Sequence, residues 1–389
     1  MQRLAACLLV LTVSLATAGI STWAAGGESQ PQAGALRDDA ERRPTIGAEG
    51  EESPASAGVT ATVECTLPSL REHIRQFVYD GDESTFYQSA EAINSETAFT
   101  LQFDEPVDLK SVTVLTGRED GEQSLGAGKL EVAGADREFR EVATFADGKA
   151  TAEGVGEVKS LRIRPTAGLQ EGEGEPLVIR EIAIDSNPRV EKFKYPVEFF
   201  VVVEDAPDLE KWAEACARLC ERQYPMINRE LASEGFTPPT AITMRLTKEY
   251  DGVAAASGTR IIGSVDYFRR HQNDMGAMVH ETAHVVQSYR SRRNPGWLVE
   301  GIADYIRFVV YEPQNIGGFN PRRARYDQSY RTSARFLAYV AETYDQQIVN
   351  KLNKAMRQGK YREELWEEYT GKSLSDLGAE WYESINASS

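Results

Sequence analysis

The stretch Ala277–Arg307, "AMVHETAHVVQSYRSRRNPGWLVEGIADYIR", holds the residues best suited to chemistry. The chain has four histidines, and two of them, His280 and His284, stand here four residues apart, with Glu281 directly after the first. A helical repeat of 3.6 residues places both imidazoles on one face, one turn apart. Zinc accepts neutral imidazole, and a catalytic zinc takes three protein ligands and keeps a fourth position open. The pattern therefore predicts a catalytic zinc site.

Glu281 has the position of a general base. On a helix it lies about 100° around the axis from His280, so it can reach a water at the metal without being a ligand itself. The alternative is an ordinary buried helix whose two histidines are satisfied by hydrogen bonds, because HExxH patterns recur by accident in long proteins.

The next predicted helix, "WLVEGIADYIR", supplies the third ligand. The turn at 294–296 lets this helix fold back, and Glu300 completes the ligand set. Asp304, one turn later, can accept the ring N–H of a ligating histidine. Gln287, about one turn after His284, is a further candidate to support a ligand. Gly301 and Ala303 leave room where the two helices pack closely.

Other third ligands fail on the sequence. A third histidine of the HExxHxxGxxH type needs Gly at Gln287 and His at Arg290, and the chain has no Gly-Thr-X-Asp segment. Two buried carboxylates without a partner would each be costly. The sequence therefore favours metal binding over the ordinary helix.

These motifs resemble the basic secretory protein family of plants and bacteria, which is classed with the gluzincin-type metallopeptidases. The resemblance runs from about Tyr195 to the C-terminal region and includes "APDLEKWAEACARLCERQYPMINREL" and "GVAAASGTRIIGSVDYF". It implies zinc at His280, His284 and Glu300, with Glu281 as the base.

Hydrolysis also needs a donor for the oxyanion of the tetrahedral intermediate. Before "ARFL" the chain resembles a family segment with a tyrosine, which here is Tyr330. Tyr326 and Tyr305 are weaker candidates, and so are the two remaining histidines, His73 and His271. A core or surface role for Tyr330 is the alternative.

The region from about Tyr195 predicts an α+β zincin-like domain, because a few strands precede a helical remainder. Asp208 is a candidate cap of a long amphipathic helix, which Pro225 should kink or divide. Asn273 or Asp274 should cap the HExxH helix. The segment "GVAAASG" is either a plain edge strand or a sheet edge that pairs with an extended peptide.

Cys216 and Cys220 lie one helical turn apart. We expect two small apolar residues on a buried helix face, with a strained bridge or a thiol site as the alternative.

Residues 61–187 predict an antiparallel β-sandwich. "FTLQFDEPVDLKSVTVLTG" alternates apolar and polar residues, and four more short alternating runs follow, separated by Gly, Asp and Pro. The segment resembles the discoidin or coagulation-factor type C family of galactose-binding-like jelly rolls. That resemblance implies binding of a glycan or cell-surface ligand through loops at one end. It also suggests calcium at Asp80, Asp82 and Glu181, although acids in a turn are often turn-formers.

The remaining sequence predicts how the chain is divided into segments and domains. Residues 1–25 have the pattern of a secretory signal peptide, so we expect a secreted or periplasmic protein. Residues 26–60, rich in Gly, Ala, Glu, Ser and Pro, predict a disordered acidic linker. The sandwich then spans 61–187 and the metallopeptidase domain 188–389. Within the net charge of −17, the first 187 residues carry 16 basic and 32 acidic side chains, which argues against a nucleic-acid partner.

Together these features predict a secreted zinc metallopeptidase of peptide or protein substrates, with an accessory sandwich that binds a surface or glycan. The alternative is a non-catalytic secreted binding protein in which the zincin half is a scaffold and the sandwich binds glycan. No stretch after residue 25 is long and apolar enough to cross a membrane.

Overall fold

The computed structural model describes residues 58–166 and 174–387. The expected signal peptide, and the expected linker up to residue 57, lie outside the described residues. Within the described part of the chain, no helix is long and apolar enough to span a membrane.

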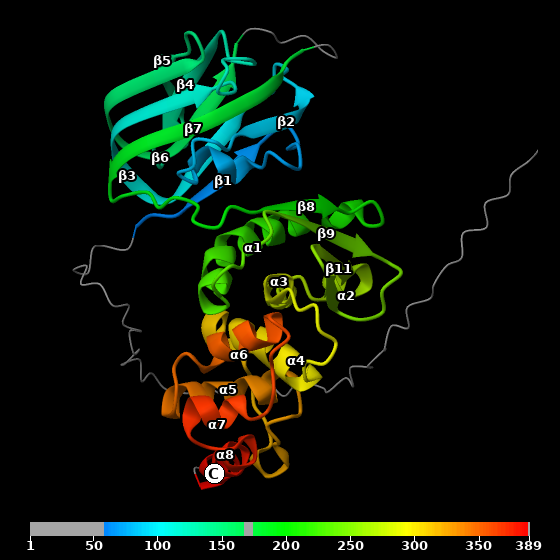
Figure 1. Cartoon of the computed structure of the whole chain (residues 1–389). Helices are drawn as coiled ribbons and strands as arrows, with labels where there is room; N and C mark the ends of the chain where they lie inside the picture. Colours follow the sequence, from blue (N-terminus) through cyan, green and yellow to red (C-terminus); the bar gives the residue numbers. More distant parts are fainter. Residues whose placement is uncertain (1–57, 167–173, 388–389) are drawn as a thin grey trace, which may run out of the picture. The chain divides into compact units, whose positions relative to one another are not determined.

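Seven strands build the N-terminal domain (Figure 1). They are β1 (Ala61–Cys65), β2 (Tyr87–Ala92), β3 (Phe99–Thr116), β4 (Gly128–Ala133), β5 (Phe139–Thr144), β6 (Lys149–Pro165) and β7 (Pro176–Asn187). Their order is β2-β7-β3-β6-β4-β5, with β1 also paired to β3, and every pairing is antiparallel. This confirms the predicted antiparallel sandwich class.

Period-two alternation produces the core of this domain. Phe99, Leu101 and Phe103 are fully buried, while the residues between them face outward. The two alternating runs around residues 99 and 112 belong to one strand, β3. Register shifts interrupt its pairing with β6, and such irregularities bend a strand. The bent strands β3 and β6 let the sheet wrap around its own apolar face.

The C-terminal domain begins with a four-stranded sheet. Its strands are β8 (Glu198–Val202), β9 (Ala241–Thr247), β10 (Ala254–Ser257) and β11 (Arg260–Ser264), in the order β10-β11-β9-β8. β8, β9 and β11 are parallel, whereas β10 runs antiparallel to β11 at one edge. The expected edge strand in "GVAAASG" is confirmed.

Eight α-helices are described after β8. They are α1 (Glu210–Glu230), α2 (Val265–Arg270), α3 (Gly276–Gln287), α4 (Gly296–Tyr305), α5 (Tyr330–Thr343), α6 (Ile348–Arg357), α7 (Leu365–Thr370) and α8 (Leu374–Ala387). A π-helical turn, Ile306–Tyr311, continues α4. Helix α1 connects β8 to β9 and the other seven helices follow the sheet, which confirms the α+β class.

Helix α3 is the central element of this domain (Figure 1). Every residue of α3 except His284 is buried, and α1, β10 and α4 pack against it. A helix that is covered on all sides is held rigidly by its neighbours. Two polar side chains on such a helix have fixed positions, and this rigidity suits a metal site.

The expectation that Pro225 divides its helix is wrong. Pro225 does not divide α1, which continues from Glu210 to Glu230. The buried stripe that includes Trp212, Cys216 and Cys220 holds the helix across the proline. Both cysteines are buried and free, as expected of two small apolar residues on a helix face.

The two expected helix caps are also wrong, because the aspartate side chains pair with residues elsewhere in the chain. Asp208 pairs with Arg269, with Oδ1 2.7 Å from Nη2, and does not cap α1. The Asp274 carboxylate accepts from the hydroxyl of Tyr267 at 2.6 Å and also pairs with Arg307. Helix α3 begins after Met275 without a side-chain cap.

Gly301 serves a different helix contact from the one predicted. A Cβ added at Gly301 would lie 2.8 Å from the Cβ of Ser333, on α5. The missing side chain therefore lets α4 approach α5 and not α3. Because α5 begins at Tyr330, this contact links the helix of Glu300 to the helix of the proposed oxyanion donor.

Candidate metal centre

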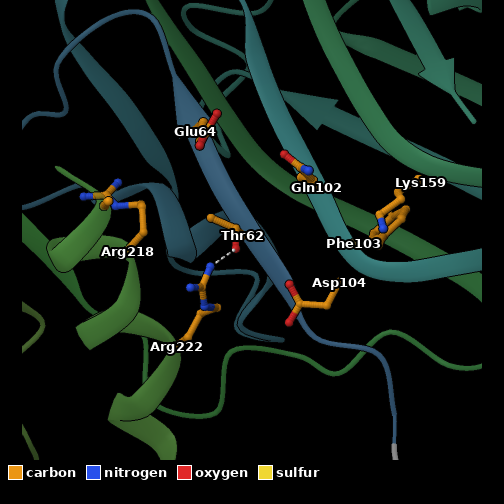
Figure 2. Close-up of a pocket in the computed structure, with 9 residues that line it drawn as sticks. Thr62, Glu64, Gln102, Phe103, Asp104, Lys159, Arg218 and Arg222 are labelled. Atoms are coloured by element: carbon orange, nitrogen blue, oxygen red, sulfur yellow. Dashed lines mark hydrogen bonds between the residues drawn. The ribbon is translucent and has the colours of Figure 1, made fainter. Parts of the chain in front are cut away.

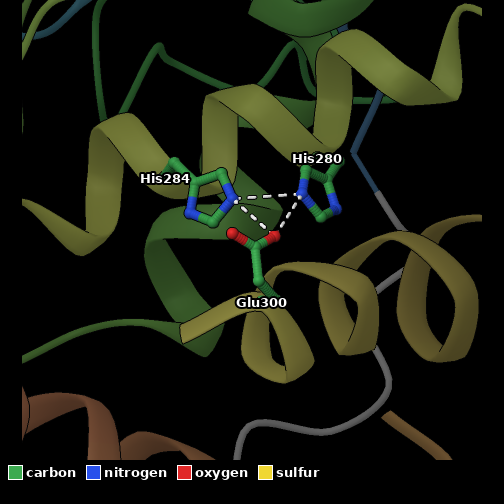
Figure 3. Close-up of side chains that lie close together, drawn as sticks. All are labelled: His280, His284 and Glu300. Atoms are coloured by element: carbon green, nitrogen blue, oxygen red, sulfur yellow. Dashed lines mark hydrogen bonds and ion pairs between the residues drawn. The ribbon is translucent and has the colours of Figure 1, made fainter. Parts of the chain in front are cut away.

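Helices α3 and α4 bring three metal-ligating side chains together (Figure 3). The Nε2 atoms of His280 and His284 are 3.0 Å apart, and the Oε2 atom of Glu300 lies 3.3 and 3.4 Å from them. Among the described residues, this is the group of three ligands whose donor atoms all lie within 4.8 Å of one another. The two histidines thus lie on one face of α3, as their spacing predicts, and Glu300 of α4 lies beside them.

Each histidine is held by a second side chain. The Nδ1–H group of His280 donates to Oδ1 of Asp304 at 2.6 Å, and that of His284 donates to Oε1 of Gln287 at 2.8 Å. Gln287 also donates from Nε2 to the carbonyl of Val299 on α4, at 2.9 Å. With Nδ1 as the donor in each ring, a neutral imidazole at either position would turn its Nε2 lone pair toward the centre of the cluster.

The charges around the cluster favour a positive charge at its centre. Burial lowers the pKa of His280, but the hydrogen bonds to Asp304 and Glu300 outweigh it and raise that pKa to about 10. Burial raises the pKa of the Glu300 carboxyl, but the two histidines hold it well below its usual range. Two imidazole nitrogens and one carboxylate oxygen converging on one point fit a divalent cation, and this N,N,O set is one that zinc accepts.

Glu281 lies beside the cluster without joining it. Its side chain is buried on α3. Its charge contributes to the raised pKa values of His284 and Tyr330, after the larger effects of burial and of neighbouring groups. Glu281 is therefore close to the centre but outside the ligand set, as the helical repeat predicts.

Tyr330 stands at the rim of the same centre. Its ring centroid is 6.4 Å from that of His280, with 27° between the planes, and the residue is 54% exposed. Its backbone and that of Ser329 both have positive φ, +52° and +68°. The Tyr326 ring packs against Phe336 in the aromatic core instead. Burial, and then the charges of Glu230 and Glu342, raise the pKa of Tyr305.

Tyr250, which no sequence motif indicates, also faces this space. Burial, and then the charges of Glu281 and Glu300, raise the pKa of Tyr250. Its hydroxyl donates to the carbonyl of Ala254, in the edge strand, at 3.1 Å. Tyr250 follows β9 in an irregular turn and matches no motif, so the sequence carries no spacing signal for it.

The other two histidines lie elsewhere. His271 follows α2 and packs its ring on Tyr267, with centroids 4.5 Å apart. His73, in the sandwich domain, stacks on Phe86 at 3.9 Å and 16°. Neither belongs to the metal-ligand group.

Phe86 contributes to a hollow of about 460 Å³ in the sandwich domain. The guanidinium of Arg118 lies over the Phe86 ring, 5.6 Å from its centroid. Glu119 and Arg180 also line the hollow. It combines an aromatic face with acceptors and donors of hydrogen bonds.

Calcium at Asp80, Asp82 and Glu181 stays a prediction. Asp80 Oδ1 accepts from the backbone N–H of Asp82 at 2.9 Å, and Asp82 Oδ1 accepts from that of Ser84 at 3.0 Å, as in ordinary turns. Glu181 is buried, one of its oxygens has no hydrogen-bond partner, and burial raises its pKa to about 7. The three do not form a ligand group of the kind found at His280 in the described part of the chain.

Figure 2 shows another hollow, of about 340 Å³. Its lining includes Glu64 and Asp104 as well as Arg218 and Arg222. Arg222 donates to the hydroxyl of Thr62 at 3.5 Å. This mixture of acids and bases fits no single class of ligand.

Residues 201–381 match the model of the BSP family, described as a peptidase of plants and bacteria. This match confirms the resemblance to the basic secretory protein family. It begins inside β8, includes the metal-ligand cluster and ends inside α8. No curated protein matched the chain.

Solved structures matched the sandwich part. One is CBM32-1 from a family 31 glycoside hydrolase of Clostridium perfringens, with 16% sequence identity and a TM-score of 0.27. The match covers 32% of this chain and 92% of that chain. CBM32-3, from a family 31 glycoside hydrolase of the same organism, has 18% identity, 34% and 98% coverage and a TM-score of 0.27. The family 32 CBM of C. perfringens NanJ, in complex with galactose, has 12% identity, 32% and 92% coverage and a TM-score of 0.27.

Proposed function

We propose that this protein is a zinc-dependent metallopeptidase of the gluzincin type. The observation that carries the proposal is the convergence of three ligand atoms from His280, His284 and Glu300, in an environment that favours positive charge. The match of residues 201–381 to a peptidase family supports the same reading.

A bound zinc ion would activate a water molecule and polarise the scissile carbonyl. The chain's own residues would do the rest. Glu281 takes the proton of the attacking water and passes it to the leaving amine. Tyr330 donates a hydrogen bond to the developing oxyanion. Asp304 and Gln287 keep both ligating imidazoles in the required tautomer and orientation.

Edge strand β10 supports a peptide as the substrate. It is the last strand of its sheet and packs against α3, the helix of the histidines. An extended peptide can pair with such an edge through its backbone, and the paired peptide would run beside the metal centre.

The test compares the wild type with Glu281→Gln. We expect one zinc per chain in both proteins, cleavage of a mixed peptide library by the wild type, and loss of that cleavage on chelation. Glu281→Gln should lower the rate about 10²- to 10⁴-fold, because it removes the base but no ligand. Glu383→Gln, an exposed glutamate of α8, is the matched control and should cleave normally.

Two results would contradict the proposal. Zinc in the wild type without cleavage of any peptide would favour the alternative, a binding protein with an inactive zincin half. A wild type that binds no zinc would leave the cluster an ordinary helix pair.

We also propose that the sandwich binds carbohydrate through the hollow at Phe86. The half-buried Phe86 ring, which stacks on His73, adds apolar surface to this hollow, while Arg118 and Glu119 can donate to and accept from the hydroxyls of a sugar. Calorimetric titration with a panel of glycans tests this. Arg118→Ala should abolish binding, whereas Lys110→Ala, an exposed charge on β3, should not.

We propose that the protein is exported, on the signal-peptide pattern of residues 1–25. N-terminal sequencing of the protein from the culture medium checks this. A mature chain that still begins at Met1 would contradict it.

A further inference from the structure

Tyr250 lies in the turn between β9 and β10, where it contacts the free edge of the sheet. We propose that Tyr250 is a positioning residue that sets where a bound peptide can begin to pair with β10. This inference rests on the proposed peptidase function and deepens it, because it concerns the register of the substrate.

The backbone of β10 alternates between its neighbour and the free edge. The carbonyl of Val253 accepts from the N–H of Ser264 at 3.0 Å, so Val253 faces β11. In an antiparallel pair, the residues between the bonded ones turn their N–H and C=O groups the other way. Ala254 and Ala256 therefore present their backbone groups to the free edge, where a peptide would pair.

Tyr250 already hydrogen-bonds to one of these backbone groups. Its hydroxyl donates to the carbonyl of Ala254 at 3.1 Å. A substrate N–H cannot use the same acceptor in that direction without displacing the hydroxyl. Tyr250 thus restricts pairing at Ala254, whereas the carbonyl of Ala256 accepts no side-chain hydrogen bond from the residues that the structure describes. An incoming peptide has a fixed starting point on the edge, next to the helix that carries the metal ligands.

Gly252 allows Tyr250 to reach back over its own turn. A Cβ added at Gly252 would lie 2.6 Å from the Tyr250 hydroxyl oxygen and 2.7 Å from the ring carbon that bears it. These atoms are the far end of a side chain that can rotate away. Gly252→Ala should therefore displace the hydroxyl without removing it, which gives a second and independent way to free the Ala254 carbonyl.

The experiment measures cleavage of synthetic peptides that grow by one residue at a time on either side of the scissile bond. Four proteins are compared: the wild type, Tyr250→Phe, Gly252→Ala and Tyr369→Phe. The last removes the hydroxyl of a tyrosine on α7 as a matched control. In the wild type, kcat/KM should stop rising at a defined length on one side.

In Tyr250→Phe and in Gly252→Ala, we expect the next residue on that side to lower KM further, by about fivefold, because the Ala254 carbonyl becomes available for one more hydrogen bond. Zinc content should stay at one per chain, and Tyr369→Phe should keep the wild-type length profile. If either substitution acted only by disturbing the fold, it would lower the cleavage rates of all peptides alike.

Three results would overturn the inference. The first is a wild type that cleaves peptides while Tyr250→Phe shows the same length profile. The second is an equal change in Tyr369→Phe. The third is a wild type that cleaves no peptide at all, and this result alone would also overturn the proposed function.

Discussion

The metal-ligand cluster and the Ser329–Tyr330 turn face the same space but are built in opposite ways. His280 and Glu300 belong to helices packed in the core, and each ligating histidine is fixed by a second hydrogen bond. Tyr330 is 54% exposed, and both residues of its turn have positive φ. The half of the site that holds the metal ligands is rigid and fully hydrogen-bonded, whereas the half that holds Tyr330 is exposed and has a strained backbone.

This difference follows from what each half must do. Metal ligands act only when their lone pairs already point at one centre, because reorganising them would weaken binding. A donor to an oxyanion must fit a position that charge occupies only during the reaction. Backbone strain of the kind seen at Ser329 persists only where the surrounding structure holds it, and such strain clusters at functional sites.

Loss of a ligand should have the largest effect. We expect His284→Ala to lose both bound zinc and hydrolysis, because two ligands do not hold the ion in a catalytic geometry. Elemental analysis and peptide cleavage check this. His271→Ala, a histidine outside the cluster, is the control and should keep its zinc. Full zinc content in His284→Ala would show that the cluster is not the metal site.

Tyr330→Phe tests the exposed half. It should lower kcat about 10²-fold and leave zinc content unchanged, because the hydroxyl contributes to the transition state and not to the ligand set. Tyr326→Phe, whose ring lies in the aromatic core, is the matched control. An unchanged kcat in Tyr330→Phe would remove Tyr330 from the mechanism and leave the strained turn without a catalytic role.

The rigid half of the site could be predicted from sequence, because one helix repeat fixes it. The spacing of His280 and His284 determines their common face, and the Pro-Gly turn before α4 brings Glu300 back to them. The exposed half could not be predicted in this way. Tyr330 was found only through a family segment, and Tyr250 not at all, since irregular turns place both.

In the fold, local patterns were reliable and long-range partners were not. Alternation along β3 predicted its buried face, and the run of strands followed by helices predicted the α+β class. The capping prediction at Asp274 failed because Arg307, 33 residues further along the chain, takes its carboxylate. The prediction for Gly301 failed similarly, because no local signal shows which of two helices a glycine will face.

Asp304→Asn tests how much the rigid half depends on its supporting hydrogen bonds. An amide in place of the carboxylate removes the charge that orients the Nδ1–H group of His280. We expect zinc affinity to fall about 10- to 100-fold. Competition with a chelator of known affinity measures the change. Asp327→Asn, a surface aspartate that pairs with Arg325, is the control. Unchanged affinity would mean that helix packing alone orients His280.

Ser329→Gly should have the smallest effect and the opposite sign. Ser329 has φ +68° and ψ 172°, a conformation that only glycine adopts without a steric penalty. Removing its Cβ should relieve about 1–3 kcal/mol of strain, offset by about 0.5–1 kcal/mol of extra chain entropy in the unfolded state. The net result should be a free energy of unfolding raised by about 1 kcal/mol. Chemical denaturation measures it.

The same variant shows whether the strain serves the reaction. If the turn holds Tyr330 against its preferred conformation, the glycine should let the ring move, and kcat should fall while stability rises. Ser288→Gly, at the αL residue that ends α3, is a matched comparison, because its φ of +48° is also positive but its position is not at the rim. A lower free energy of unfolding in Ser329→Gly would mean that the turn is unstrained, and the contrast between the two halves of the site would then rest on exposure alone.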